Sequence, residues 1–409
     1  MPETRSAAPE NLRSGVFMPP WSLPLTLSPA TAIRREIEFV EFLDRVGYDE
    51  AWIGEHHSGG MEIIASPELF IAAAVERTSR IRLGTGVISL PYHNPLMTAD
   101  RIVQLDHQAR GRAMFGFGHG LLPADAAMLG IPADSQRGRM SDAVDVIVRL
   151  LAGETVTKHT DWYTLEEATL HVGPFTRPRP HLAVASAITP SAGRIAGRHG
   201  MGMLCVAAGS GPGYEVLDLN WRIAEEQAAE HGHTMDRSEL RLVAPFHIAE
   251  TRDQAFTEVQ EGYQRWSAYM YDTLEGGPSL LGLDSLEKIN EEGHGAIGTV
   301  EDAVNALHRY WTKSGGFGCI LNQQTHWADD ETTRRSYRTF VDEVMPAFTG
   351  STGPRHGSHE WTRNRRADLS ARSRGAANKA IQAHFAASDT SRPNGGEPAT
   401  DPATASPNV

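Results

Sequence analysis

Residues 81–117 read IRLGTGVISLPYHNPLMTADRIVQLDHQARGRAMFGF, and this stretch carries the pattern that predicts the fold. The apolar run over 81–90 predicts a strand, residues 98–109 have the spacing of an amphipathic helix, and 113–117 predict a second strand. Both strands are almost continuously apolar, which is typical of parallel strands buried on both faces. The stretch is therefore predicted to form a strand–helix–strand unit of a parallel sheet.

The same alternation continues on both sides of this unit. Six further strands are predicted, at 16–18, 51–54, 182–185, 203–207, 240–248 and 318–322. Each of the eight predicted strands is followed by a segment of helical period. Eight such units predict a (β/α)8 TIM barrel with insertions. A doubly wound open sheet remains the alternative, because periodicity does not reveal whether the sheet closes.

The two ends of the chain depart from this pattern. Residues 1–14 are polar and aperiodic, and we expect a flexible N-terminus there. The barrel domain is predicted over 15–349. Residues 350–409 are rich in Ser, Thr, Arg, Ala, Pro and Gly, so this C-terminal extension is predicted to be largely disordered for lack of apolar surface. Within it, residues 376–385 have the composition of a short helix.

Composition excludes several classes of protein. The 409 residues are 40% apolar and carry a formal net charge of −13, which argues against nucleic acid or an anionic membrane as a partner. Two cysteines, Cys205 and Cys319, provide neither a disulfide framework nor a thiolate zinc cluster. The sequence shows no signal-peptide core and no membrane-spanning apolar run. We therefore expect a cytoplasmic protein.

Polar side chains follow several predicted strands at the point where each strand ends. Glu55, His56 and His57 follow the second strand, residues 89–93 the third, residues 116–120 the fourth and residues 186–191 the fifth. In a TIM barrel the carboxyl ends of the strands carry the active site. The sequence therefore predicts a site at this end of the barrel.

Metal and dinucleotide sites are weak interpretations of these residues. Successive residues of an extended segment point to opposite sides, so Glu55, His56 and His57 are poorly placed to bind one ion, and no metal site is predicted. The glycines at 116, 118 and 120 follow a strand, but a GxGxxG fingerprint requires glycine at position 121, which is Leu121. We expect these glycines to let a flat ligand approach the backbone closely.

Thr189, Pro190 and Ser191 open a predicted helix directly after a strand. Backbone N–H groups at a helix N-terminus, together with hydroxyl groups, form a natural phosphate site. Arg137 and Arg139, at the start of another helix, would balance the charge. Ordinary helix capping explains the same residues, and both interpretations stay open at this point.

These motifs, taken together, resemble those of the bacterial luciferase-like monooxygenases. The resemblance rests on WIGEHH at 52–57, LGTGVISLP at 83–91, Asn94-Pro95, Asp106, Gly111-Arg112 and GTVED at 298–302. The motifs occur in the family's order, and the resemblance covers residues 15–348. Within the family, the sequence is similar to the limonene monooxygenase group.

The resemblance implies a TIM barrel that uses reduced flavin and O₂ to insert one oxygen atom into an apolar, terpene-like small molecule through a C4a-peroxyflavin. FMN, delivered by a separate flavin reductase, is the expected cofactor, with FAD and the deazaflavin F420 as alternatives. A homodimer is also implied. F420-dependent hydride transfer and non-catalytic flavin binding are the alternative functions.

The resemblance also assigns roles to individual residues. His56 matches the family's catalytic histidine, and Glu55 is expected to orient or tune it. Gly86 and Val87 match a non-prolyl cis peptide beneath the flavin ring. Asp125 corresponds to an acidic residue near the flavin.

The resemblance favours phosphate binding by Thr189, Ser191 and Arg137. Two further cofactor-binding positions depart from luciferase, because Gly118 replaces its reactive cysteine and His119 its phosphate-contacting arginine. Neither thiol chemistry nor light emission is therefore expected. A lid after the seventh strand, at 271–295, is expected to exclude water.

Overall fold

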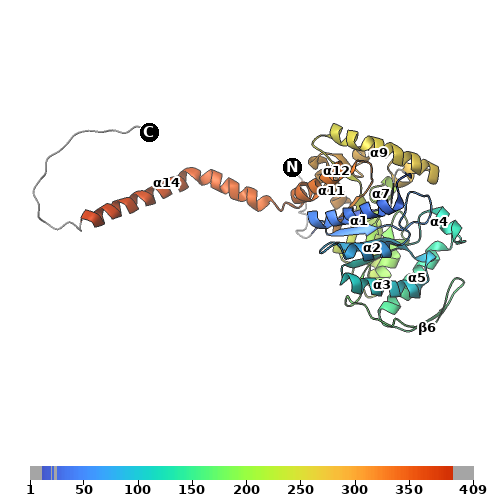
Figure 1. Ribbon diagram of the computed structural model, residues 1–409. Coiled ribbons are helices and arrows are strands. Elements are labelled where there is room, and N and C mark those ends of the chain that lie inside the picture. Colours follow the sequence, from blue (N-terminus) through green and yellow to red (C-terminus); the bar gives the residue numbers. More distant parts are fainter. Residues whose placement is uncertain (1–11, 20, 23–24, 390–409) are drawn as a thin grey trace, which may run out of the picture. The chain divides into compact units, whose positions relative to one another are not determined.

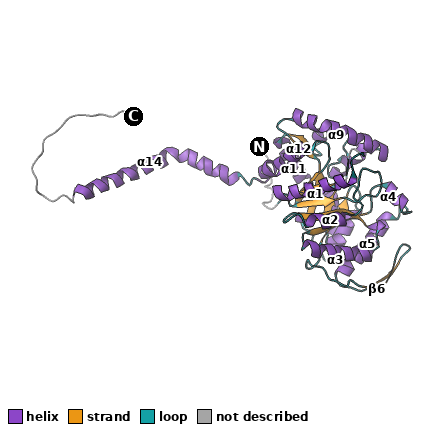
Figure 2. Ribbon diagram, viewed as in Figure 1, coloured by secondary structure: helices purple, strands orange, loops and turns teal. Residues whose placement is uncertain are grey.

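The computed structural model describes residues 12–19, 21–22 and 25–389. The chain divides into two compact units, of which the first ends at Gly350 and the second begins at Ser351. Figures 1 and 2 show the first unit as a ring of strands enclosed by helices.

Eight parallel strands form the closed barrel of the first unit. In order around the barrel they are β1 (Arg13–Met18), β12 (Cys319–Gln323), β9 (Leu240–Ala244), β8 (Gly202–Cys205), β7 (His181–Ser186), β4 (Ala113–Gly118), β3 (Arg82–Ser89) and β2 (Glu50–Ile53). The barrel closes where β1 pairs with both β12 and β2. The predicted TIM barrel is confirmed, and the open doubly wound sheet is excluded.

Helices cover the outside of the barrel and lie between successive strands. They include α1 (Pro29–Val46), α2 (Pro67–Val75), α3 (Pro95–Ala109), α5 (Gln136–Leu151), α6 (Ser191–His199), α8 (Leu217–Glu230), α11 (Val300–Ser314), α12 (Asp330–Thr339), the π-helix η4 (Phe340–Val344) and α13 (Met345–Thr349). Several begin at a local signal. Asn94 accepts hydrogen bonds from the N–H groups of Leu96 and Met97 ahead of Pro95. Proline fits the first helical position because its missing N–H has no partner there.

The barrel interior is filled from its amino end. The buried Glu50 and Arg241 side chains form an ion pair with Nε and Oε2 2.7 Å apart, and Trp52 Nε1 donates to Glu50 at 2.9 Å. Burial alone would raise the pKa of Glu50, but Arg241 and neighbouring arginines lower it to about 2. Above this ion pair, the interior is packed with Trp52, Met114, Ala183, Leu204, Val243, Cys319 and Leu321.

Two small sheets lie outside the barrel. An antiparallel hairpin joins β5 (Val156–His159) to β6 (Thr164–Ala168), and β10 (Phe246–Ile248) pairs in parallel with β11 (Ala296–Gly298). The single strand predicted over 240–248 is therefore wrong. It divides at Pro245, which lacks the N–H that would continue the barrel ladder. The residues before Pro245 stay in the barrel, and those after it pair with β11.

The remaining elements lie in the connections. They are η1 (Leu90–Tyr92), α4 (Pro123–Met128), α7 (Gly211–Glu215), η2 (Arg237–Glu239), α9 (Arg252–Thr273), η3 (Gly277–Leu281) and α10 (Leu286–Glu291). The last three connect β10 to β11 and include the segment predicted as a lid.

Both ends of the chain differ from expectation within the described residues. Arg13 and Ser14, assigned to a flexible N-terminus, belong to β1, whereas residues 1–11 lie outside the described residues. The extension predicted to be largely disordered instead contains the helix α14 (Gly353–Asp389), which includes the expected helix at 376–385. Between Arg355 and Asp389 the sequence has no proline and many good helix formers. The rest of the extension, 390–409, lies outside the described residues.

The second unit contrasts with the first in charge and burial. Helix α14 carries seven basic and three acidic residues, and every side chain from 353 to 387 is exposed.

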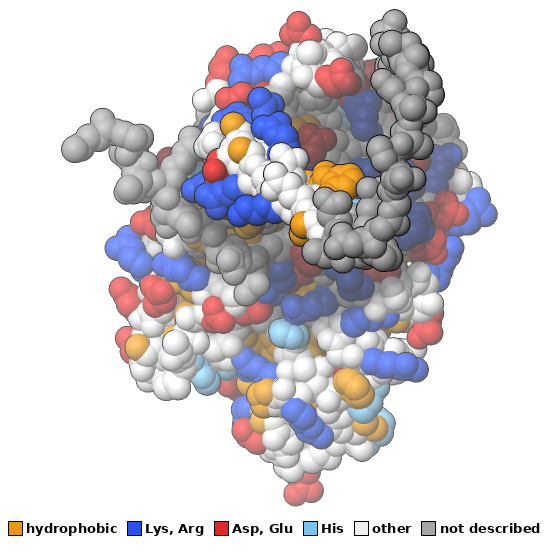
Figure 3. Space-filling model, turned by 90° about the vertical axis from the view of Figure 1, so that its left-hand side faces the viewer, with side chains coloured by type: hydrophobic (Ala, Val, Ile, Leu, Met, Phe, Trp, Pro, Cys, Tyr) orange, Lys and Arg blue, Asp and Glu red, His pale blue; other side chains and the backbone are white. Residues whose placement is uncertain are grey.

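Acidic and basic side chains are mixed over the face of the molecule seen in Figure 3. No described helix combines the length and apolarity needed to cross a membrane.

Candidate active site

The loop after β2 places three consecutive polar residues at the carboxyl-end opening of the barrel, which we call the mouth. Glu50 and Trp52 point into the barrel, and Ile53 packs in the outer core. Continued alternation puts His56 on the side of the barrel axis, and puts Glu55 and His57 on the opposite side. The contacts agree with this division, because the two sides form separate clusters.

The first cluster, the His56 cluster, consists of His56, Glu62 and Asp125. The His56 Nε2 atom lies 2.8 Å from Glu62 Oε2, and its Nδ1 atom lies 3.3 Å from Asp125 Oδ2. The side chains of Glu62 and Asp125 are only 9% and 1% exposed. Both nitrogens of the imidazole therefore face carboxylate oxygens in a mostly buried environment.

This arrangement favours a positively charged imidazole. Burial by itself would lower the pKa of His56, but the contacts with Asp125 and Glu62 outweigh it and raise the pKa to about 9. Burial would raise the pKa of Asp125, but hydrogen bonds from His56 and Ser58 lower it. At neutral pH the cluster consists of an imidazolium between carboxylates.

Asp125 lies in α4 and is fixed by several donors. The backbone N–H of His57 donates to Asp125 Oδ1 at 3.2 Å, and the Ser58 hydroxyl donates to the same oxygen. The structure thus brings together His56 and Asp125, two residues that the sequence analysis named separately.

The second cluster, the Glu55 cluster, consists of Glu55, His57 and His93. Glu55 Oε1 lies 2.8 Å from His57 Nε2 and 2.9 Å from His93 Nε2, and Oε2 accepts the Ser89 N–H at 3.0 Å. The expectation that Glu55 orients His56 is therefore wrong. Adjacent residues of an extended segment diverge, so Glu55 reaches His57 and the loop after β3 instead.

The electrostatics of the Glu55 cluster follow from these hydrogen bonds. Burial would raise the pKa of Glu55, but the donors His57 and His93 lower it to about 2. The hydrogen bond to Glu55 raises the pKa of His57. A charged carboxylate is therefore shared by two histidines.

Glu55, His57 and His93 also have the composition of a metal site. Their ligand-type atoms lie within 4.8 Å of one another. We interpret the group as a hydrogen-bonded network, because each nitrogen–oxygen contact has an ordinary hydrogen-bond length and the second oxygen of Glu55 is occupied by the Ser89 N–H.

The peptide bond between Gly86 and Val87 is cis, as the resemblance implies. This bond lies in β3 near the mouth. A side chain on Gly118 would collide with Val87. Similarly, a side chain on Gly116 would collide with the carbonyl oxygen of Thr85. The space that a side chain at either glycine would need is thus occupied by β3, which explains the absence of a Cβ at these positions. The expected approach of a flat ligand to this backbone stays a prediction.

His119 directly follows β4 at the mouth, and Arg137 lies in the first turn of α5. The carbonyl oxygen of His119 accepts a hydrogen bond from Gln136 Nε2 at 2.9 Å, which joins the end of β4 to the start of α5. Burial and the nearby charge of Arg137 lower the pKa of His119. Arg137 is exposed. His119 is therefore expected to be neutral at pH 7, close to the exposed positive charge of Arg137.

Thr189 and Ser191 flank the start of α6. Their hydroxyl oxygens lie 2.9 Å apart, and neither side chain accepts from the helix backbone as a cap would. Thr189 is exposed. The hydroxyl groups are therefore available at a helix N-terminus, which disfavours the capping interpretation.

An apolar cluster, the mouth cluster, covers the same end of the barrel. Its buried members include Trp21, Met61, Leu122, Val259, Trp266, Met270 and Trp327. Leu274, Leu283, Leu286 and Ile289 from the predicted lid belong to it as well. Trp21 Nε1 donates to Glu62 Oε1 at 2.6 Å, so the mouth cluster contacts the His56 cluster directly.

Glu62, Ser58 and the partner role of His93 were not predicted from the sequence. Glu62 is a single acidic residue in the stretch SGGMEII, and no motif distinguishes it. His93 lies at the end of the stretch 89–93, and its Nε2 atom contacts Glu55. Side chains alternate in direction along residues 55–57. This alternation alone predicts that His56 has different partners from Glu55 and His57.

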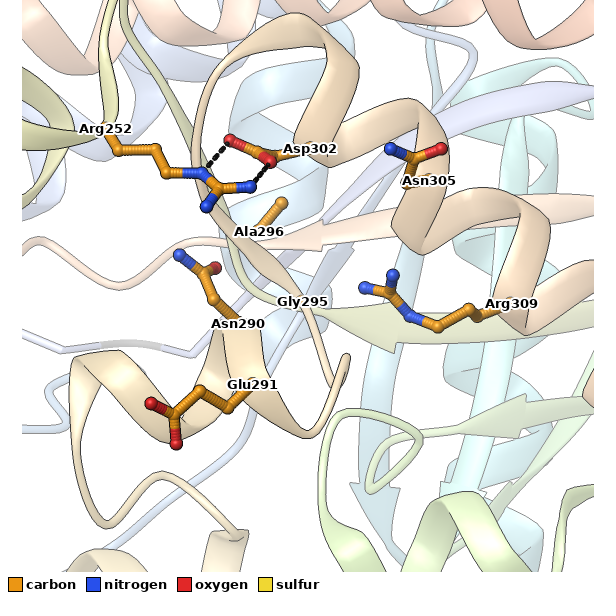
Figure 4. A pocket seen from close by; sticks show the side chains of 8 residues that line it. All are labelled: Arg252, Asn290, Glu291, Gly295, Ala296, Asp302, Asn305 and Arg309. Atoms are coloured by element: carbon orange, nitrogen blue, oxygen red, sulfur yellow. Dashed lines mark hydrogen bonds and ion pairs between the residues drawn. The ribbon is translucent and has the colours of Figure 1, made fainter.

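A separate pocket lies among α9, α10, β11 and α11. It has a volume of about 210 Å³ and is lined by Arg252, Asn290, Glu291, Gly295, Ala296, Asp302, Asn305 and Arg309. Figure 4 shows the ion pair between Arg252 and Asp302 on one side of it and the Arg309 side chain on another. We place the chemistry at the mouth, where the buried titratable groups converge.

Comparison with known proteins identifies relatives of the whole barrel. The family model described as luciferase-like monooxygenase matches residues 12–316. Limonene 1,2-monooxygenase of Rhodococcus erythropolis is 46% identical over 86% of this chain and 90% of its own length. The 4-hydroxyprotoasukamycin monooxygenase of Streptomyces nodosus subsp. asukaensis is 41% identical over 86% of this chain and 96% of its own.

A more distant relative represents the alternative chemistry. The F420-dependent glucose-6-phosphate dehydrogenase of Beutenbergia cavernae is 30% identical over 67% of this chain and 77% of its own length. The identity to the two monooxygenases is higher and extends over more of the chain.

Solved structures share the fold. A monooxygenase of Streptomyces bottropensis superposes with a TM-score of 0.74 at 23% identity, covering 82% of this chain and all of that one. The oxygenating constituent of 3,6-diketocamphane monooxygenase from Pseudomonas putida, in complex with FMN, gives 0.67 at 22% identity, covering 82% and 98%. The family match and the two close relatives confirm the predicted resemblance. The chain therefore belongs to the luciferase-like monooxygenase family and is a flavin-dependent monooxygenase.

Proposed function

We propose that this monooxygenase uses reduced FMN and O₂ to insert one oxygen atom into an apolar, terpene-like small molecule. The observation that carries the proposal is the position of His56, held between Glu62 and Asp125 at the same mouth as the cis Gly86–Val87 peptide. A cationic N–H donor close to this cis peptide suits a site that stabilises an anionic oxygen.

The residues at the mouth fit a flavin that carries a phosphate. Thr189 and Ser191 present hydroxyl groups at the N-terminus of α6, and Arg137 offers an exposed guanidinium group. Such donors match a phosphate dianion. Gly86 and Val87 would support the ring system, with Gly118, His119 and Asp125 nearby. The reduced flavin, when bound, supplies the electrons that activate O₂.

The chain itself controls protons and water. His56 donates an N–H at the mouth, and Asp125 fixes the ring through its Nδ1 atom. The mouth cluster excludes water with Trp21, Trp266 and Trp327. Water exclusion protects a reactive oxygen species from unproductive breakdown.

The substrate class is inferred from the mouth cluster and the relatives. The aromatic and aliphatic residues of the cluster favour an apolar molecule. The name of the relative from Rhodococcus erythropolis gives limonene as its substrate, and limonene is a terpene hydrocarbon. We extend this substrate class to the present chain.

Two partners complete the proposal. No strand of the barrel is followed by a GxGxxG fingerprint, because position 121 after β4 is Leu121 and the match GHGAIG at 293–298 runs into β11. A separate flavin reductase would therefore oxidise the nicotinamide and deliver reduced FMN. The working form would be a homodimer, as the resemblance implies.

The experiment is an anaerobic titration with reduced FMN, and in parallel with reduced F420, followed by rapid mixing with O₂ and limonene. We expect saturable binding of reduced FMN and a transient absorbance that differs from those of reduced and oxidised flavin. With ¹⁸O₂, one labelled oxygen atom should enter the product. Binding of F420 alone would instead support hydride transfer, and flavin binding without any oxygenated product would support a non-catalytic role.

A further inference from the structure

His56 is held from two sides by carboxylates that come from different parts of the chain. Asp125 belongs to α4, whereas Glu62 lies in the loop between β2 and α2. The contact with Glu62 is the shorter one, at 2.8 Å from Nε2 against 3.3 Å from Nδ1 to Asp125. The family resemblance assigns no role to Glu62.

The geometry dictates the protonation of the ring. A neutral imidazole carries one N–H and one lone pair. In either neutral form, a lone pair would face a carboxylate oxygen at close range, which is repulsive. With both nitrogens protonated, each faces an acceptor. The two carboxylates together therefore select the doubly protonated ring.

The two carboxylates are not equally anchored. Asp125 accepts from His56, from the His57 N–H and from Ser58. Glu62 contacts His56 through one oxygen and accepts from Trp21 Nε1 through the other, at 2.6 Å. Asp125 thus holds the Nδ1 side of the ring in place. Glu62, on the Nε2 side, has fewer hydrogen bonds and can move away when another acceptor binds.

The surrounding charges leave Glu62 as the main partner of Nε2. Within the described part of the chain, neither Glu62 nor Asp125 forms an ion pair with a lysine or arginine. Glu55 turns away to His57 and His93. From α9, Tyr269 approaches the loop, and its hydroxyl donates to the carbonyl oxygen of Gly59.

Trp21 connects Glu62 to the mouth cluster. The Trp21 ring packs against Trp266 of α9 with ring centroids 5.5 Å apart. The Nε1 atom of the same ring holds Glu62. The position of the carboxylate therefore depends on the packing of the segment that covers the mouth.

We propose that Glu62, anchored by Trp21, is a positioning residue that holds the Nε2 side of His56 and makes this histidine a proton donor in the reaction. In the step that we envisage, the proton on Nε2 passes to an anionic oxygen that derives from O₂. His56 is left as a neutral imidazole that donates through Nδ1–H to Asp125, and it regains a proton from solvent. The assignment of the reaction rests on the proposed function, whereas the positioning of the ring does not.

The test is a titration of His56 in the full chain without flavin. Histidine labelled with ¹³C at Cε1 gives an NMR signal whose shift follows the protonation of each ring, and His56→Gln identifies the signal of His56. We expect the wild-type midpoint at the raised pKa of His56, about 9, and a fall of at least about one pH unit in Glu62→Gln. Trp21→Phe keeps the packing but removes the N–H, and it should lower the midpoint by a smaller amount.

Glu68→Gln is the matched control. Glu68 is also a buried carboxylate near the start of α2, but its partners are Arg101 and Ser66. It should leave the midpoint of His56 unchanged. An unchanged midpoint in both Glu62→Gln and Trp21→Phe would overturn the proposal. If Glu62→Gln does not fold, Trp21→Phe decides alone.

Activity provides the second readout. With reduced FMN, O₂ and limonene, Glu62→Gln should lower kcat more than it raises KM, and the alkaline limb of the pH profile should move to lower pH. A profile that keeps its position would contradict the proton-donor role. If the midpoint of His56 falls as expected but wild type forms no oxygenated product, the positioning of His56 stands and the proposed function fails.

Discussion

The His56 cluster and the Glu55 cluster use the same two residue types in opposite proportions. In the first, one histidine lies between two carboxylates, and in the second, one carboxylate lies between two histidines. Their central residues are adjacent in the sequence. The difference teaches that the charge on each central group is set by its partners across the fold and not by its neighbours along the chain.

The two clusters also differ in the strength of their connection to the mouth. The His56 cluster contacts the mouth cluster through Trp21. The Glu55 cluster instead ties the loop after β2 to the loop after β3 through Ser89 and His93. We therefore expect the first to govern turnover and the second to govern stability.

The largest effect is expected for His56→Ala. This variant should retain most of its affinity for reduced FMN but lose product formation by about 100-fold or more, as expected for loss of an acid–base group. Steady-state turnover and a binding titration measure the two quantities separately. Unchanged turnover would reject the role of His56 and remove the contrast between the clusters.

Glu55→Gln should act mainly on stability. It removes a buried charge that accepts three hydrogen bonds, and an amide can accept through only one oxygen. We expect a loss of about 2–3 kcal/mol in the free energy of unfolding, measured with urea at neutral pH. The rate per folded molecule should change by less than in His56→Ala. The reverse order of effects would mean that the roles of the two clusters are exchanged.

The pH dependence of stability should separate the clusters at opposite ends of the scale. The raised pKa of His56, about 9, gives stability that is complete below the unfolded value near 6.5 and is lost as pH rises through 9. The lowered pKa of Glu55, about 2, gives stability that is present above about 4.3 and is lost as pH falls toward 2.

Urea unfolding at a series of pH values tests this separation. His56→Gln should flatten the alkaline decline and leave the acid decline, and Glu55→Gln should do the opposite. Identical pH profiles for both variants and wild type would show that neither cluster contributes.

The smallest effect is expected for His93→Gln. The amide can still donate to Glu55, so the loss in the free energy of unfolding should be about 0.5–1 kcal/mol. Urea unfolding of His93→Gln, run in parallel with Glu55→Gln, measures this loss in the free energy of unfolding. A loss as large as that of Glu55→Gln would mean that His93, rather than the shared carboxylate, holds the two loops together.

Sequence reasoning recovered the barrel because its signal is repeated. Each of the eight predicted strands contributes one strand to the barrel, although the one predicted over 240–248 divides into β9 and β10. The unit at 81–117 shows why the barrel was predictable, because continuous apolar runs and a helix between them leave few alternatives. The prediction failed where a single residue decides, as at Pro245, whose missing N–H ends one strand and lets the next residues join another sheet.

The candidate site was predictable in its parts but not in its connections. The resemblance gave the cis peptide at Gly86–Val87 and pointed to His56 and Asp125. It did not give Glu62, because a lone acidic residue in an irregular loop has no periodicity and its partner is set by the path of the chain. The role of Glu55 was misassigned for the same reason, although the alternation of the strand already separated it from His56.

The filled amino end of the barrel restricts how ligands can enter and leave the site. Arg241 lies over the Trp52 ring, with its guanidinium carbon 5.1 Å from the ring centroid, and both side chains are almost fully buried. Among the described residues, these two side chains fill the barrel axis on that side. We therefore expect gas, cofactor, substrate and product to enter and leave at the mouth, so that the order in which they bind becomes part of the catalytic cycle.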